Sequence, residues 1–317
     1  ISFVPLSIYD EFSADAFWSK INLSQKFSPK EDIYVYYGVL DTLGLEYHKT
    51  DSGEVPYTKY RLHRCSSLST ALAGENKSFS NNNVILYGGL EYGDSLVATS
   101  RGADKGFLEY SETEIDSIGA ILEKTGKDIT YKKNEEGTLE SFCKLSYHSP
   151  HIIHLATHGC SNKKTHWFNT LENRFNYFRQ NTDIQQREWL MNNTGLFMSL
   201  DSVGNNVMYA NTVASCDLSE TELVVLSACS TMSGEHSDGN MQTVGLTTAF
   251  SLASAQNIIT SLRDVNDEKT CEFMTIFYQQ YVDSNTLYES FRNTVLKMKD
   301  KYPNNSHFWN SFVLVES

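Results

Sequence analysis

Three short apolar runs in the second half of the chain constrain its fold most strongly. They lie at 152–156 (IIHLA), 223–226 (LVVL) and 257–261 (NIITS). Strands that are apolar along their whole length, rather than at every second residue, are typical of parallel sheets with helices on both faces. Stretches with helical periodicity at 243–253 and 267–281 flank the third run. We therefore expect an α/β fold with a mostly parallel central sheet and helices on both faces.

The first half of the chain shows the same alternation of strand and helix signals. Isoleucines and a leucine recur on one face of a helix predicted over 112–124. Thr138 is of a type favoured as an N-cap, and it opens a second predicted helix. The predicted elements are strands at 33–37, 84–87 and 129–131 and helices at 112–124 and 138–145. The stretch 160–193 breaks this rhythm because it is polar and aromatic, and we expect it to be an insertion near the rim of the sheet.

Composition and charge narrow the classes of function. The 317 residues carry a formal net charge of −13, which argues against nucleic acid and against an anionic membrane surface as partners. No apolar run is long enough to cross a bilayer, and residues 1–10 show no signal peptide. The six cysteines are scattered without a C-x-x-C pair, which favours a reduced, cytoplasmic protein. The chain begins without Met, which leaves room for a region upstream.

Two of the predicted strands run directly into reactive side chains. The run at 152–156 continues into His158, and the run at 223–226 continues into Cys229. Ligands of open α/β sheets bind outside the carboxyl ends of the strands, so the imidazole and the thiol can approach each other if these strands are neighbours. A thiol needs such a base to ionise near neutral pH. The N–H groups of Gly159 and Cys229 would then face a developing oxyanion.

Other interpretations compete with this one. A Cys after an apolar strand is often only a small buried hydrophobe, and we assign His154, inside its strand, to packing or to a buried hydrogen bond. Cys160 is the one alternative nucleophile. A metal site is a further alternative, but its candidate ligands lack the paired spacings of zinc modules, so no metal and no cofactor is predicted. Those ligands are His158, Cys160, His166 and Cys216. No G-x-S-x-G elbow and no complete P-loop occur in the sequence.

Longer motifs surround the two strand ends. They are HLATHG (154–159), ELVVLSACST (222–231), VGLTTAFSLASAQNIITSL (244–262), VNDE (265–268) and FWNSFVL (308–314). Together they strongly resemble the motifs of the CHAT peptidases, relatives of separase and the caspases. In that family the His of A-T-H-G and the Cys of S-A-C form a catalytic dyad, and these residues are His158 and Cys229 here. The resemblance implies a cysteine endopeptidase that cleaves a protein substrate and is restrained by a helical-repeat region or an adaptor.

The resemblance also implies a caspase-like α/β sandwich. Its catalytic subdomain would span residues 149–317, and residues 1–148 would form a degenerate companion, a pseudo-peptidase subdomain without its own dyad. The sequence departs from the family after S-A-C, where STMSGE (230–235) replaces the usual T-G pair, and at Arg263 and Asp264, where Trp and Pro are common. These departures concern the loop and the substrate pocket. A catalytically dead pseudoprotease that binds a peptide or protein is therefore the alternative function.

Acidic residues follow the strand at 257–261, whose carboxyl end would open onto the same cleft. Asp267 and Asp264 are the candidate substrate-binding residues, because a carboxylate in a partly dry pocket can pair with an Arg guanidinium. The resemblance points the same way, since separase-like relatives carry an acid at the position of Asp267, where it meets a basic P1 residue. We expect cleavage after Arg or Lys. Asp267 could instead cap a helix at 268–281, and Arg263 could neutralise it.

Overall fold

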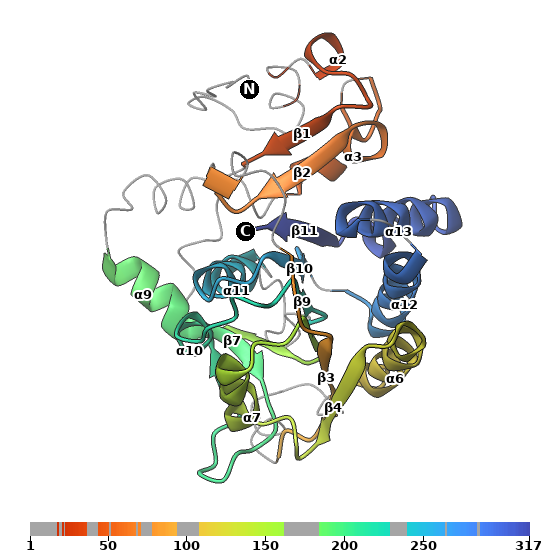
Figure 1. The fold of residues 1–317 in the computed structure, drawn as a ribbon. Coiled ribbons are helices and arrows are strands. Elements are labelled where there is room, and N and C mark those ends of the chain that lie inside the picture. The colour runs from red at the N-terminus through yellow and green to blue at the C-terminus, as the bar shows by residue number, and fades with distance from the viewer. Residues whose placement is uncertain are drawn as a thin grey trace.

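A computed structural model shows how these elements are arranged. It describes residues 18, 21, 23–36, 44–50, 52–67, 69–70, 78–93, 108–161, 184–228, 240–263, 265–283 and 286–317. Within these ranges the strands form one sheet of eight strands and one of three. The larger sheet runs through the middle of the molecule between helices (Figure 1). Its strand order is β1-β2-β11-β10-β9-β5-β3-β4.

The larger sheet is parallel except where β10 meets β11. The predicted α/β fold with a mostly parallel sheet is therefore confirmed. Each predicted strand is present, and β2 and β11 are strands that were not predicted. The strands are β1 (Asp32–Val35), β2 (Arg61–Cys65), β3 (Asn83–Leu90), β4 (Asp128–Asn134), β5 (Ile152–Leu155), β9 (Leu223–Leu226), β10 (Asn257–Ser261) and β11 (Phe312–Glu316).

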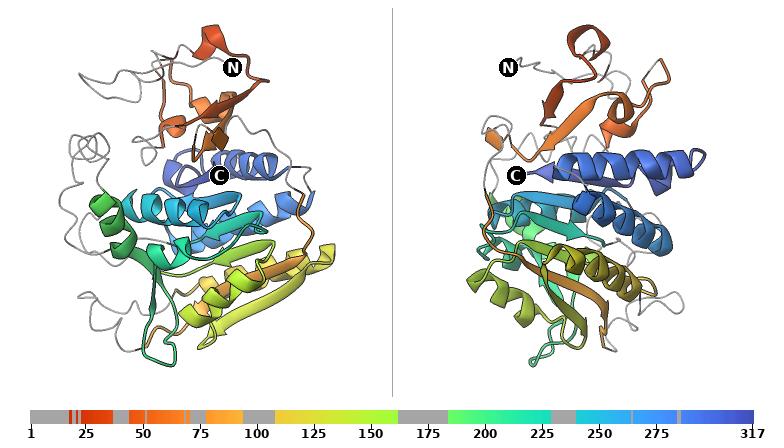
Figure 2. Two further views of the ribbon diagram at one scale, coloured as in Figure 1. Left: turned by 60° about the vertical axis from the view of Figure 1, so that its left-hand side comes forward. Right: turned by 45° about the vertical axis from the view of Figure 1, so that its right-hand side comes forward.

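Two hydrophobic cores lie on the two faces of this sheet, and helices cover both (Figure 2). The helices of the first face are α6 (Ser111–Leu122), α12 (Asp267–Asp283) and α13 (Leu287–Lys301), and those of the second are α7 (Leu139–Cys143), α10 (Ala210–Ala214) and α11 (Asn240–Leu252). Strand β9 serves both cores. Leu223 and Val225 belong to the first, and Val224 and Leu226 belong to the second. Burial on both faces is the physical reason for an apolar run without alternation.

Shorter elements complete the described part of the chain. Thr138 Oγ1 accepts the Ser141 N–H at 3.1 Å, which confirms Thr138 as the N-cap of α7. The stretch predicted as an insertion ends in α9, and its residues 162–183 lie outside the described ranges. The remaining helices are α2 (Leu23–Lys26), α3 (Pro56–Lys59) and α9 (Ile184–Asn193), with 3₁₀ turns at Leu45–Tyr47, Glu123–Thr125, Lys144–Tyr147 and Ser306–Phe308. Over the ranges given above, no helix combines the length and the apolar character needed to cross a membrane.

The smaller sheet starts where the candidate base ends. It is antiparallel and consists of β6 (Gly159–Ser161), β7 (Thr194–Phe197) and β8 (Val207–Tyr209). Strand β6 begins directly after His158, so the chain passes from the larger sheet into the smaller one at this residue. The smaller sheet therefore lies beside the carboxyl edge of β5.

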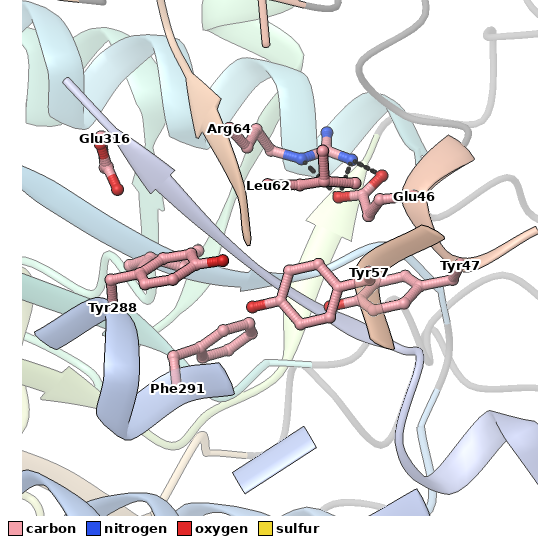
Figure 3. Close-up of a pocket in the computed structure, with 9 residues that line it drawn as sticks. Glu46, Tyr47, Tyr57, Leu62, Arg64, Tyr288, Phe291 and Glu316 are labelled. Atoms are coloured by element: carbon pink, nitrogen blue, oxygen red, sulfur yellow. Dashed lines mark hydrogen bonds and ion pairs between the residues drawn. The ribbon is translucent and has the colours of Figure 1, made fainter. Parts of the chain in front are cut away.

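Charged side chains are buried where β2 joins β11. Arg64 donates to both carboxylate oxygens of Glu46 at 2.7 and 2.8 Å, and both residues are buried. A small cavity beside them has about 10 Å³ of room for the centre of a water molecule, which is about what one water needs. Tyr57 and Tyr288 point their hydroxyls toward each other in it (Figure 3). The charge of Arg64 in β2 can be buried because it is paired with Glu46. The RLHRC sequence of β2 therefore lacks the continuous apolar run of the other central strands.

Strands from both sides of residue 148 share the larger sheet. β3 and β5 pair in parallel, with Val84 opposite Ile152. The division into subdomains at 1–148 and 149–317 stays a prediction. A boundary at this point would separate strands that hydrogen-bond to each other.

Candidate active site

The strands that lead to His158 and Cys229 are neighbours. β5 and β9 pair in parallel, with Leu155 opposite Leu226. His158 stands three residues after Leu155, and Cys229 stands three residues after Leu226. Both segments therefore leave the sheet at its carboxyl edge, at matched positions on adjacent strands. The adjacency on which the predicted dyad depends is confirmed. Cys229 itself lies outside the described residues, and Ala228 is the last described residue before it.

Main-chain and aromatic contacts hold the His158 segment at this edge. The His158 side chain is buried, and its carbonyl oxygen accepts the Phe197 N–H from β7 at 2.8 Å. Its imidazole lies against the ring of Tyr92, with 5.3 Å between the ring centroids and 51° between the planes. Thr157 donates its hydroxyl to the Phe197 carbonyl oxygen at 2.5 Å. The candidate base is thus fixed by β7 as well as by β5.

The peptide that enters Cys229 is held from the next strand of the sheet. Ser261, the last residue of β10, donates its hydroxyl to the Ala228 carbonyl oxygen at 2.8 Å. Both residues are buried, and β10 pairs in parallel with β9. The sequence predicts the strand that carries Ser261. It does not reveal this contact, because the two partners are 33 residues apart.

Gly159 begins β6 and lies opposite Leu196 in antiparallel register. The preceding pair is hydrogen-bonded, since the Phe197 N–H donates to the His158 carbonyl. Bonded and non-bonded pairs alternate along an antiparallel ladder, so the Gly159 N–H points away from β7. This direction leaves the N–H available for the predicted oxyanion role. The second predicted donor, the Cys229 N–H, lies outside the described residues.

Asp267 is the first residue of α12, and its Oδ2 accepts the Tyr110 N–H at 2.9 Å. Burial raises the pKa of Asp267, the Tyr110 N–H opposes that shift, and the charges of Glu114 and Glu109 add to it. Burial and like charges both disfavour the ionised carboxylate. A cation placed beside the carboxylate would offset both effects. Asp264, the other predicted substrate-binding residue, lies outside the described residues.

Two alternative roles of Asp267 do not fit its surroundings. The cap of α12 is Asn266, whose Oδ1 accepts the Lys269 N–H at 3.0 Å, so the prediction that Asp267 caps this helix is wrong. Arg263 does not neutralise Asp267. Burial lowers the pKa of Arg263, and the groups that oppose this shift are Tyr47 and Glu46 rather than Asp267. The carboxylate of Asp267 therefore keeps its negative neighbours.

The described cysteines are poor nucleophiles at neutral pH. Burial raises the pKa of Cys160 to about 12, and it raises those of Cys216 and Cys271 to about 11. A thiol reacts as its thiolate, so Cys160 is disfavoured as the alternative nucleophile. Among the residues that the structure describes, no three His, Cys, Asp or Glu side chains are placed to hold a metal ion. His166 lies outside them.

His154 has the structural role that the sequence predicts. Its Nε2 lies 2.7 Å from Glu114 Oε1, and its Nδ1 lies 3.2 Å from the Tyr278 hydroxyl. The pair is completely buried, and it joins β5 to α6 and to α12, the helix that begins with Asp267. Sequence reasoning missed Glu114 and Tyr92, because each has its partner in an element far along the chain.

The fold and the paired strand ends define a class of protein. An α/β sandwich whose adjacent parallel strands lead to a His and a Cys has the architecture of the caspase-like peptidase clan. Residues 37–317 match the family model of the CHAT domain, and the chain belongs to that family. The resemblance seen in the sequence motifs is therefore confirmed. No match to the chain was found among curated proteins.

Among solved structures, the chain is similar to the crystal structure of the Arg specific cysteine proteinase gingipain R. The identity is 12% and the TM-score is 0.47. The match covers 82% of this chain and 55% of that one, so the chain spans about half the length of the gingipain structure.

Proposed function

We propose that the chain is a cysteine endopeptidase in which Cys229 is the nucleophile and His158 the general base. The main support is the register of β5 and β9, because both residues follow the same distance after paired leucines. Membership of the CHAT family supports the same class of enzyme. The raised pKa of Cys160 favours Cys229 over the other thiol near His158.

In the proposed reaction, His158 takes the proton of the Cys229 thiol, and the thiolate attacks the carbonyl carbon of the scissile peptide. The carbonyl electron pair moves to oxygen, where the N–H groups of Gly159 and Cys229 stabilise the negative charge. The His158 imidazolium then protonates the leaving amine as the C–N bond breaks. A water molecule, deprotonated by His158, hydrolyses the thioester and restores the Cys229 thiol.

The proposed substrate carries Arg or Lys at P1, held by Asp267 with Asp264 as the second candidate. The support is electrostatic. The Asp267 carboxylate is half-buried, and the charges of Glu114 and Glu109 raise its pKa together with burial. A guanidinium can bind such a carboxylate through two parallel hydrogen bonds. A neutral P1 side chain would leave the repulsion between Asp267 and its acidic neighbours uncompensated, so this carboxylate favours a positively charged P1 side chain.

The proposed setting is the cytoplasm, with a protein substrate and a helical-repeat or adaptor regulator. The five described cysteines are free thiols, which fits a reducing compartment. The regulator follows from the family resemblance. Neither nucleic acid nor a membrane is proposed as a partner, because the net charge of −13 disfavours both.

A peptidyl acyloxymethyl ketone with Arg at P1 tests the proposed dyad, because it alkylates only an activated thiolate held next to a bound peptide. The full chain is incubated with the probe, and the labelled residue is identified by mass spectrometry. We expect labelling at Cys229 that is lost in His158→Ala and retained in Cys160→Ala, the matched control. Peptide binding without labelling would favour the pseudoprotease instead, and labelling of Cys160 would show that the proposed nucleophile is wrong.

A further inference from the structure

Tyr92 contacts both of the residues at the end of the β5 segment, and the proposed mechanism does not use it. It follows β3, which flanks β5 on the side opposite to β9. We propose that Tyr92 is a positioning residue that holds the His158 imidazole in the orientation needed to accept the Cys229 proton. This inference rests on the proposed function and adds to it a residue from outside the dyad.

A directed chain of hydrogen bonds ties Tyr92 to the base. Thr157 has one hydroxyl proton, which it donates to the Phe197 carbonyl oxygen at 2.5 Å. The Tyr92 hydroxyl, 2.9 Å from Thr157 Oγ1, must therefore donate to it. The main-chain N–H of His158 also hydrogen-bonds to the Tyr92 hydroxyl. The phenol thus contacts the side chain of Thr157 and the backbone of His158, while its ring lies against the imidazole with 5.3 Å between the centroids.

Tyr92 is itself held firmly. Its side chain is buried, and its carbonyl oxygen accepts a hydrogen bond from Asn206 Nδ2 at 3.2 Å. The next residue, Gly93, has φ 70°, and a Cβ there would lie 2.3 Å from Leu200 Cδ1. The backbone therefore passes where only glycine fits. Leu200 and Asn206 lie in the connection between β7 and β8, so the smaller sheet contributes to holding Tyr92 as well as His158.

The environment of the phenol favours a positioning role over proton transfer. Burial raises the pKa of Tyr92 to about 12, and the charge of Asp267 contributes to the increase. The phenol therefore stays protonated at neutral pH. A tyrosine ring within about 6 Å of an imidazolium stabilises its positive charge, which favours the thiolate–imidazolium form of the dyad.

Two substitutions separate the ring from the hydroxyl. Tyr92→Phe keeps the ring and removes the hydrogen bond, and we expect kcat to fall about threefold. Tyr92→Leu removes both, and we expect kcat to fall about 10-fold because the imidazolium loses its aromatic neighbour. KM for an Arg peptide should stay within about twofold of wild type, since uniform substrate binding is untouched.

A pH profile supplies a readout that a purely structural role would not change. The rate of Cys229 alkylation by iodoacetamide is measured between about pH 5 and 10, where imidazoles and thiols titrate. Losing stabilisation of the imidazolium should move the ionisation of Cys229 to higher pH in Tyr92→Leu. Tyr87→Phe and Tyr87→Leu are the matched controls, because Tyr87 is a buried tyrosine on β3 whose hydroxyl lies 3.4 Å from Ser141 Oγ, away from His158.

The outcomes distinguish the positioning role of Tyr92 from the proposed Cys229–His158 dyad on which it rests. A lower kcat with unchanged KM and a shifted profile, in the Tyr92 variants alone, supports the positioning role. A normal profile in Tyr92→Leu, or equal changes in the Tyr87 variants, would overturn it while the dyad stands. If wild-type Cys229 shows no alkylation that depends on His158, the proposed function fails and this inference fails with it. Should Tyr92→Leu not fold, Tyr92→Phe decides the question: a fall of about threefold in kcat at unchanged KM supports the positioning role, and an unchanged kcat overturns it.

Discussion

The carboxyl edge of β5 and the seam between β2 and β11 both bury a histidine, but they surround it differently. At the seam, His63 lies 2.7 Å from Glu316 and 3.0 Å from Asp32. At the carboxyl edge, the His158 ring contacts the Tyr92 ring, and the His158 main-chain carbonyl oxygen accepts the Phe197 N–H. Both histidines contact an aromatic ring, since His63 stacks on Tyr288 at 3.7 Å. The carboxylates beside both ring nitrogens of His63 also favour its charged form. The first surroundings suit a structural ion pair, and the second suit a general base.

The carboxylates of the two regions also differ, in the direction in which their pKa values are shifted. Burial would raise the pKa of Asp32 at the seam, but Arg61 and His63 outweigh it, and the net shift is downward. Burial raises the pKa of Asp267, and its charged neighbours Glu114 and Glu109 strengthen the effect. The seam therefore satisfies its charges internally. The candidate active site keeps a negative charge that a ligand can satisfy.

The largest expected effect is on stability and concerns the buried pair of Glu114 and His154. Like the seam, this pair has a structural role. Removing one partner of a completely buried hydrogen-bonded pair leaves the other partner unsatisfied, so Glu114→Ala should lower the free energy of unfolding by about 3 kcal/mol. Urea denaturation measures it. Glu112→Ala is the matched control, because Glu112 lies on the same helix, half-exposed, in an ion pair with Lys133, and should cost less than about 1 kcal/mol. Equal losses in both variants would contradict a special role of the buried pair.

The next effect concerns the acid at the candidate active site. Asp267→Ala should lower kcat/KM for Arg and Lys peptides about 100-fold, the scale of a lost charge-assisted pair, and leave a matched Leu peptide nearly unchanged. Steady-state assays with Arg, Lys, Leu and Asp at P1 measure this. Glu268→Ala, at the exposed neighbouring acid, is the control and should behave as wild type. An equal loss on all four peptides would point to misfolding, and a wild-type preference for Leu or Asp would contradict the proposed specificity.

The smallest effect tests the fixed charge of His63. Burial by itself lowers the pKa of His63, but Glu316 and Asp32 reverse this, and the net shift is upward. Because the pKa of His63 is raised in the folded state, its protonation stabilises the fold at pH values below the unfolded pKa of about 6.5. This stabilisation is lost as pH rises through the folded pKa. His63→Gln should therefore cost about 1.5 kcal/mol at about pH 6 and less at about pH 9. Urea denaturation at the two pH values checks this. A constant cost would mean that stacking on Tyr288, at 3.7 Å, matters more than charge.

The sequence predicted the parts of this molecule whose signal is local. The apolar runs of β5, β9 and β10 follow from burial on both faces, and His158 and Cys229 were found because they directly follow two of these runs. Strand β2 was missed because two of its buried positions are His63 and Arg64, whose partners lie in other elements. Tyr92 was missed for a related reason. Its contact with Thr157 spans 65 residues, and only the arrangement of β3 beside β5 brings the two together.

The central claim, that His158 activates Cys229 and not another thiol, is tested most directly by competitive alkylation of all six cysteines in one sample of the full chain. At about pH 6.5 an ordinary thiol is almost fully protonated, whereas a thiol paired with an imidazole is ionised. We expect iodoacetamide to label Cys229 at least about 100-fold faster than Cys160, whose pKa burial raises to about 12. In His158→Ala this advantage should disappear. Equal labelling of Cys229 and Cys160 in the wild type, or fast labelling of Cys229 that persists in His158→Ala, would contradict the account.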